Sequence, residues 1–211
     1  FLFALSAFLY LIGIAALVSG FVHIRQAKCV VSPTWRIADF LERAKKMKDG
    51  EELRFMNSYV PEMETVIPAL EEICLQENKE IKVKVLLFDY VNAPHLIQSR
   101  LKYRTDWGSE ADDPVQVVRE NARKFVALRD KLQEKQSKAE IEIRLYDHAA
   151  IGGYYQIGKH TMLLMFFYTK RSGQAGPALL CDGINCKKWK MFSDNFKESW
   201  NHARPIQPSD L

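Results

Sequence analysis

Polar side chains that are able to hold a ligand follow three of the strands that the sequence predicts. In an open α/β sheet, ligands bind beyond the carboxyl ends of the parallel strands. We therefore expect these strand ends to line one pocket. The polar residues are Asn57, Ser58 and Tyr59 after the first strand, Asp89, Tyr90 and Asn92 after the second, and Asp147, His148 and Tyr154 after the third.

A fourth polar group, Lys170, Arg171 and Ser172, follows the apolar strand TMLLMFFY. Two cations followed by Ser-Gly bring charge and backbone donors together, which suits a phosphate or another anion. Ordinary explanations stay open for all four groups. Asp and Asn commonly form turns at strand ends, Gly-Gly is a common turn, and a basic pair on a loop is usually solvated.

The sequence holds none of the common catalytic motifs. A GxSxG elbow, a P-loop and a GxGxxG turn after a strand are all absent from it. Asp147 and His148 are adjacent, so on a strand they point to opposite faces and do not form an acid–base pair. We therefore expect neither a recognisable catalytic set nor a cofactor.

The four cysteines fit a reducing compartment. Cys74 falls on an apolar helix face and is expected in the core. Cys181 and Cys186 are separated by four residues, and His202 follows them further on. A zinc site needs about four closely spaced ligands, so this set is too small and we expect no metal.

The first 22 residues contain no charged side chain. As a helix they rise roughly 33 Å at about 1.5 Å per residue, enough to cross a hydrocarbon core of about 30 Å. We therefore predict a transmembrane helix at residues 1–24, followed by a juxtamembrane linker at residues 25–34. A cleavable signal peptide is the alternative, but it needs a basic leader, a shorter apolar core and a small-residue cleavage site.

Basic residues directly after the predicted span set its expected orientation. His23, Arg25 and Lys28 lie there, and basic residues are retained on the cytoplasmic side. We therefore expect a single-pass protein of the cell membrane with a cytoplasmic C-terminal domain. Small residues within residues 1–24, such as Gly13 and Gly20, allow close helix contacts and would support a homo-oligomer.

Hydrophobic periodicity predicts one α/β domain at residues 35–211. Its core is a βαβ unit, which should be parallel and right-handed. The expected fold class is a mixed, mostly parallel sheet flanked by helices. The predicted helices cover residues 35–47, 61–74, 92–104, 113–136 and 186–203; the predicted strands cover residues 53–60, 81–89 and 140–147, with three closing strands after them. The basic residues of the helix at 113–136 lack interleaved aromatics, so no nucleic-acid binding is expected.

The order of these elements resembles the phospholipase D-like domain. The resemblance covers about residues 35–205 and rests on LRFMNSYVPEMETVIPALEEIC, IKVKVLLFD, RLYD, IGKHTMLLMFFY and FKESWNHARPI. That superfamily's catalytic signature is His-x-Lys with Asp four residues later. This chain departs from it, because Met162 stands two positions after His160 and Ala150 two positions after His148. The resemblance therefore implies a degenerate, single-copy domain of the kind found in prokaryotic regulatory and defence-associated proteins.

Three functions remain open from the sequence. The first is a membrane-anchored sensor or effector, in antiviral defence by analogy, whose domain binds an anionic ligand such as a nucleotide, or a protein partner, and signals to the span. The second is a phosphodiesterase or lipid-acting enzyme with an atypical site at the membrane surface. The third is an interaction module that the span tethers to the bilayer.

Overall fold

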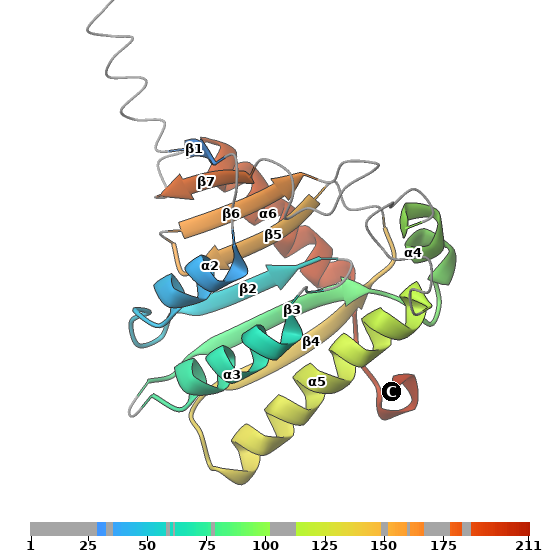
Figure 1. Ribbon diagram of the computed structural model, residues 1–211, viewed down its shortest axis with the longest axis horizontal. Coiled ribbons are helices and arrows are strands. Elements are labelled where there is room, and N and C mark those ends of the chain that lie inside the picture. The colour runs from blue at the N-terminus through green and yellow to red at the C-terminus, as the bar shows by residue number, and fades with distance from the viewer. Residues whose placement is uncertain are drawn as a thin grey trace, which may run out of the picture.

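An eight-stranded mixed sheet forms the centre of the molecule (Figure 1). The computed structural model describes residues 29–32, 36–57, 60, 62–76, 79–101, 113–148, 152–159, 161–166, 178–182 and 187–211. The strands are β1 (Cys29–Ser32), β2 (Glu52–Met56), β3 (Lys82–Phe88), β4 (Glu140–Tyr146), β5 (Gly152–Ile157), β6 (Thr161–Phe166), β7 (Ala178–Asp182) and β8 (Arg204–Pro205). The helices are α2 (Ile37–Ala44), α3 (Met63–Cys74), α4 (Pro94–Leu101), α5 (Pro114–Glu134) and α6 (Lys187–His202).

The strand order is β1-β7-β6-β5-β2-β3-β4-β8. Strands β2, β3 and β4 are parallel to one another, as the predicted βαβ unit requires, and the other pairings are antiparallel. The register brings several strand ends to one edge, which we call the carboxyl edge. It comprises the last residues of β2, β3, β4 and β6 and the first residue of β5: Met56, Phe88, Tyr146, Phe166 and Gly152.

One face of the sheet is apolar and covered by α2, α3 and α5 (Figure 1). Phe55 of β2 stands at its centre, with ring centroids 6.1 Å from Phe40, 6.3 Å from Phe125 and 5.5 Å from Tyr155. The predicted apolar stripe of α5 is buried from Val115 to Leu132. Burial of such side chains is the main favourable term in folding, so this face is the core of the domain.

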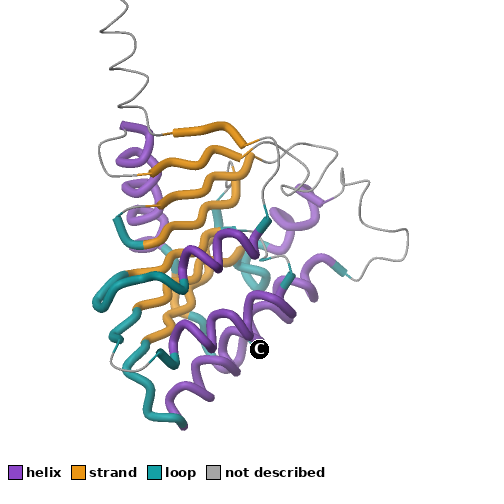
Figure 2. Tube along the Cα trace, turned by 60° about the vertical axis from the view of Figure 1, so that its left-hand side comes forward, coloured by secondary structure: helices purple, strands orange, loops and turns teal. Residues whose placement is uncertain are grey.

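Helix α6 covers the opposite face of the sheet (Figure 2). This face carries charged side chains. Arg54 lies over the Phe196 ring at 5.1 Å, and Lys84 and Arg144 lie over the Trp200 ring at 5.3 and 4.7 Å. These residues alternate with core residues along each strand, because successive side chains of a strand point to opposite faces. The aliphatic stems and aromatic rings thus cover this face of the sheet.

The N-terminal prediction is only partly within the described structure. No helix among the described residues is long and apolar enough to cross a membrane. The predicted span, residues 1–24, lies outside them. Within the predicted linker, Cys29–Ser32 form β1 and pair with β7, so the domain begins before residue 35.

The two cysteines Cys74 and Cys181 are in different states. Cys74 is a free thiol, and its burial raises its pKa to about 12. Cys181, however, is disulfide-bonded and fully buried. The sequence does not predict this bond, because spacing along the chain does not show which cysteines the fold brings together.

Candidate functional site

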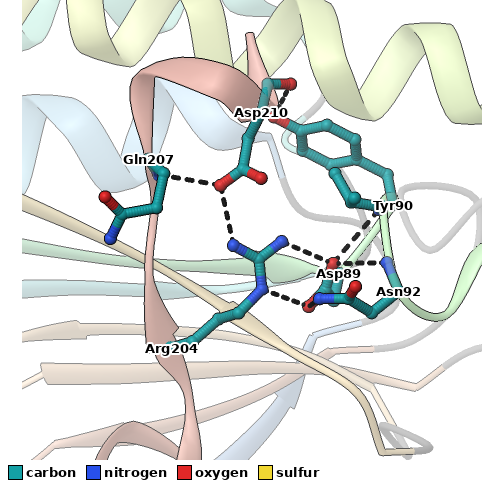
Figure 3. Close-up of polar contacts among 7 residues, drawn as sticks. Asp89, Tyr90, Asn92, Arg204, Gln207 and Asp210 are labelled. Atoms are coloured by element: carbon teal, nitrogen blue, oxygen red, sulfur yellow. Dashed lines mark hydrogen bonds and ion pairs between the residues drawn. The ribbon is translucent and has the colours of Figure 1, made fainter.

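The end of β3 is closed by a network of charges around Asp89 (Figure 3). Asp89 is 3% exposed. Its Oδ2 accepts from Arg204 Nε at 2.6 Å, and its Oδ1 accepts from Arg204 Nη2 at 2.9 Å. Val91 N and Asn92 N donate to Oδ1, and Asn92 Nδ2 donates to Oδ2. Both carboxylate oxygens are therefore occupied by groups of the chain itself.

The protonation of Asp89 follows from these contacts. Burial alone would raise its pKa, but the hydrogen bonds from Arg204 and Asn92 outweigh burial and lower the pKa to about 2. Asp89 is therefore an anion at any physiological pH. A permanently charged, fully paired carboxylate has no capacity left for general acid or base work.

The C-terminal segment completes this network. Arg204 Nη1 donates to Asp210 Oδ2 at 2.7 Å, and the same oxygen accepts from Gln207 N at 2.7 Å. Tyr90 OH donates to the Asp210 carbonyl at 3.1 Å. Of the predicted ligand-binding residues, Asp89, Tyr90 and Asn92 thus do come together, but as a structural lock between β3 and the last residues of the chain.

The neighbouring end of β4 is arranged differently. Asp147 and His148 follow the strand and are exposed. The His148 Nε2 lies 2.9 Å from the buried Ser199 hydroxyl of α6, and its ring centroid is 5.1 Å from that of Tyr146. Ser199 and Tyr146 therefore orient an imidazole that remains open to solvent. Of the predicted residues described here, His148 is the one best placed to meet a ligand.

Asn57 and Tyr154 lie on opposite faces of the sheet. Asn57 is buried and its Nδ2 donates to Tyr155 OH at 3.0 Å, on the apolar face. Tyr154 is also buried, stacks on Phe196 at 5.4 Å and hydrogen-bonds to Gln156 under α6. Neither side chain reaches the exposed part of the carboxyl edge. The predicted pocket therefore does not gather these two residues with His148.

Five predicted residues lie outside the described part of the chain: Ser58, Tyr59, Lys170, Arg171 and Ser172. The position of the strand before the last three is described. Phe166, at the end of β6, pairs with Gly152 in register. That end of β6 is therefore on the carboxyl edge, the same edge at which His148 follows β4.

A cavity of about 480 Å³ lies where the ends of β2 and the starts of α3 and α5 meet. Four carboxylates and one lysine are among its lining residues, which are Val60, Glu62, Met63, Glu64, Asp113, Gln116, Val117, Glu120, Asn121 and Lys124. Lys124 is paired with Glu64 at 2.8 Å. Like charges repel, so this part of the carboxyl edge disfavours a phosphate or other anion.

A groove of about 450 Å³ continues from this cavity between α3 and α5. Met63, Ile67 and Pro68 contribute to its apolar part. Ion pairs cross it, because Glu71 contacts Lys131 at 2.7 Å and Lys135 at 2.9 Å. Lys124, Lys131 and Lys135 are thus engaged with carboxylates of α3.

Sequence reasoning missed Arg204, Asp210 and Ser199. Arg204 follows α6, and its charge meets Asp89, which lies 115 residues earlier in the sequence. No local pattern carries such a contact. The sequence offered one signal. Asp89 stands at the end of a strand with an apolar sequence, and a carboxylate buried there requires a cation from elsewhere in the chain.

Comparison with known proteins identifies the fold. No protein-family model and no curated protein matches the sequence. The phosphatidylserine synthase of Haemophilus influenzae Rd KW20, a phospholipase D family member, aligns with a TM-score of 0.52 and 11% identity over 84% of this chain and 39% of that one. The described structure therefore has a phospholipase D-like α/β fold.

Two further structures align below that level. The phospholipase D family member Nuc of Salmonella typhimurium gives a TM-score of 0.45 at 12% identity, over 85% of this chain and 96% of that one. The archaeal chromatin protein TrmBL2 aligns with a TM-score of 0.46 and 13% identity, over 92% of this chain and 60% of that one. The chain spans less than two thirds of TrmBL2 and of the synthase, so their activities are not transferred to it.

Proposed function

We propose that this chain is a membrane-anchored binding module, a degenerate phospholipase D-like domain that recognises a small phosphate-bearing ligand and signals to its span. The observation that carries the proposal is His148, an exposed imidazole at the carboxyl edge held by Ser199 at 2.9 Å. An imidazole N–H can donate a hydrogen bond to a phosphate oxygen.

Electrostatics select the part of the carboxyl edge where the ligand would bind. The part near β2 is lined by carboxylates, and the end of β3 is closed by the Asp89–Arg204 pair. The ends of β4 and β6 remain, and β5, β2 and β3 separate them in the sheet. The end of β4 is followed by His148, and that of β6 is followed in sequence by the predicted anion-binding residues Lys170, Arg171 and Ser172. These side chains favour a phosphate-bearing ligand over a cation at either position.

Packing offers a route from this edge toward the N-terminus. Asn57, directly after β2, donates to Tyr155 OH. The Tyr155 ring lies 5.5 Å from Phe40 of α2, the first helix after the predicted span. A ligand that shifts the β2–β5 region would be felt at α2 through these contacts.

The test is a thermal-shift screen of the full chain in detergent micelles against inorganic phosphate and linear and cyclic nucleotides. A ligand at a hundredfold excess over Kd should stabilise the fold by about 2.7 kcal/mol. We expect one phosphate-bearing compound to raise Tm, and His148→Ala and Arg171→Ala to remove most of that rise.

The matched control is Arg129→Ala, which removes the same charge from the second half of α5, where Arg129 pairs only with its neighbour Asp130 among the described contacts. It should leave the ligand-induced shift unchanged. Equal losses in both arginine variants would mean that net charge, not a site, governs the response. No shift with any compound would overturn the anionic-ligand proposal and favour a protein partner.

One observation favours an enzyme as the second candidate. The His148–Ser199 contact pairs a base with a hydroxyl, the arrangement by which nucleophiles are activated. The synthase with the same fold is named for chemistry on a phospholipid. Phospholipid turnover that is abolished by both His148→Ala and Ser199→Ala would establish this alternative. Turnover unaffected by both variants would exclude this pair as its site.

A further inference from the structure

Strand β1 closes one side of the sheet and contains Cys29. It pairs antiparallel with β7, and Cys29 stands directly opposite Cys181 in the register. Residues directly opposite in an antiparallel pair have Cα atoms about 4.5–5.5 Å apart. A disulfide requires a Cα separation of about 4.4–6.8 Å. The backbone at Cys29 and Cys181 is therefore already spaced for a disulfide.

The other cysteines narrow the choice of partner. Cys181 is disulfide-bonded and 0% exposed. Cys74 of α3 is a free thiol, so it is not the partner. Within this chain, Cys29 and Cys186 remain. Cys29 is the one whose position opposite Cys181 is fixed by four consecutive residue pairs between β1 and β7.

We propose that Cys29 and Cys181 form this disulfide, and that the domain therefore matures on the oxidising side of the membrane rather than in the cytoplasm. The two thiols lose two protons and two electrons to a disulfide-carrying donor protein, which is reduced to its dithiol as the new S–S bond forms. Such donors operate in the periplasm, the secretory pathway and similar compartments.

This inference opposes the orientation predicted from charge. The charge argument rests on His23, Arg25 and Lys28, which are all on one flank of the predicted span. A buried disulfide depends directly on the redox conditions under which the domain folds. The disulfide proposal is independent of the ligand-binding proposal, but it changes the compartment in which the domain would bind a ligand.

The bond would also connect the predicted span to the sheet. Cys29 lies seven positions after Val22, the last residue of the uncharged N-terminal segment. A covalent bond to β7 would transmit a displacement of the span first to the β1 side of the sheet, and to α2 only afterwards. Since Cys181 is fully buried, a reductant would reach the bond only when β1 separates from β7.

The pairing is tested by counting thiols in the full chain from acid-quenched, denatured membranes with a maleimide that adds a visible mass per thiol. Without reductant we expect two labels on the wild type, at Cys74 and Cys186, and four after reduction. Cys29→Ser should then show three labels without reductant, because Cys181 loses its partner. Cys186→Ser should show one. Because the samples are denatured, the counts do not require the variants to be stable.

Each other result overturns a defined part of the proposal. Four labels on the unreduced wild type would mean that no disulfide forms. One label on Cys29→Ser together with three on Cys186→Ser would assign the bond to Cys186.

The compartment is tested with protease added outside intact spheroplasts, followed by detection of a C-terminal tag. Loss of the tag supports an external domain, whereas protection until lysis contradicts it.

Discussion

Asp89 and Asp147 occupy equivalent positions at the ends of neighbouring parallel strands, yet their surroundings are opposite. Each directly follows the last residue of its strand, and these last residues, Phe88 and Tyr146, are paired in register. Asp89 is 3% exposed and bound by Arg204, whereas Asp147 is exposed. A carboxylate at a strand end is thus structural where the chain supplies its own cation, and remains open to solvent where it does not.

The largest expected effect separates these two carboxylates. Asp89→Ala leaves the Arg204 charge without its main partner and removes the acceptor for Val91 N and Asn92 N. Removing one member of such a pair costs about 3 kcal/mol or more, which corresponds to a Tm roughly 6–12 °C lower for a chain of this size. Tryptophan fluorescence during heating of the full chain in detergent measures it.

Asp147→Ala is the matched control for that measurement. It removes the same side chain at the equivalent position, but from an exposed site, so the free energy of unfolding should change by about 0.5 kcal/mol at most. Similar losses of stability in both variants would contradict the division between a locked and an open strand end.

Acid should weaken the locked end by the next largest amount. The pKa of Asp89 is lowered to about 2 from an ordinary 3.8. A carboxyl with a lowered folded-state pKa stabilises the fold above its unfolded pKa, and this stabilisation disappears as the pH falls from about 4 to 2. We expect a loss of roughly 2 kcal/mol across that range. The melting temperatures of the wild type and Asp89→Asn should converge as the pH falls to 2. A difference in melting temperature that stays constant over this range would contradict the expected role of Asp89.

Arg204→Lys should produce a smaller loss. The variant keeps the positive charge but cannot donate in parallel to both Asp89 oxygens and also reach Asp210, since an ammonium lacks the planar fork of a guanidinium. The free energy of unfolding should fall by about 1–2 kcal/mol. Chemical denaturation measures this loss. The matched control is Arg144→Lys, the same substitution at another arginine of the sheet. An unchanged denaturation midpoint for Arg204→Lys would show that positive charge alone holds the C-terminal segment against Asp89.

Apart from the Asp147→Ala control, the smallest effect on stability is expected for His148 at the open end. His148→Ala removes one hydrogen bond, to Ser199, from an exposed residue, and such a bond contributes about 1 kcal/mol. Ligand binding should suffer more than stability does. A variant with a greatly lowered Tm would instead give His148 a structural role like that of Asp89, and the comparison between the two strand ends would no longer hold.

The predicted elements follow the structure closely where hydrophobic periodicity is strong. The helix predicted from Asp113 begins at Pro114, with Val115 N donating to the Asp113 side chain, and ends at Glu134. The helix that carries Met63 and Cys74 has those residues as its bounds. Periodicity succeeds here because each helix buries one continuous stripe against the sheet.

The candidate site was harder to predict, because its contacts join distant parts of the chain. The strand-end rule selected Asp89 and His148 correctly as neighbours at one edge. It could not distinguish them, since Arg204 and Ser199 reach them from the C-terminal segment and from α6. It also placed Asn57 and Tyr154 in one pocket, whereas the pleat sends their side chains to opposite faces.

The pairing of β1 with β7 has a consequence for biosynthesis. The strand nearest the N-terminus is made first, but its partner lies about 150 residues later in the chain. At roughly 5–20 residues per second, a ribosome needs about 8–30 s to complete that interval. During this time β1 is an edge without a partner, of the kind that recruits other chains. The nascent protein should therefore depend on a chaperone, or on rapid formation of the β2–β3–β4 core, until β7 emerges.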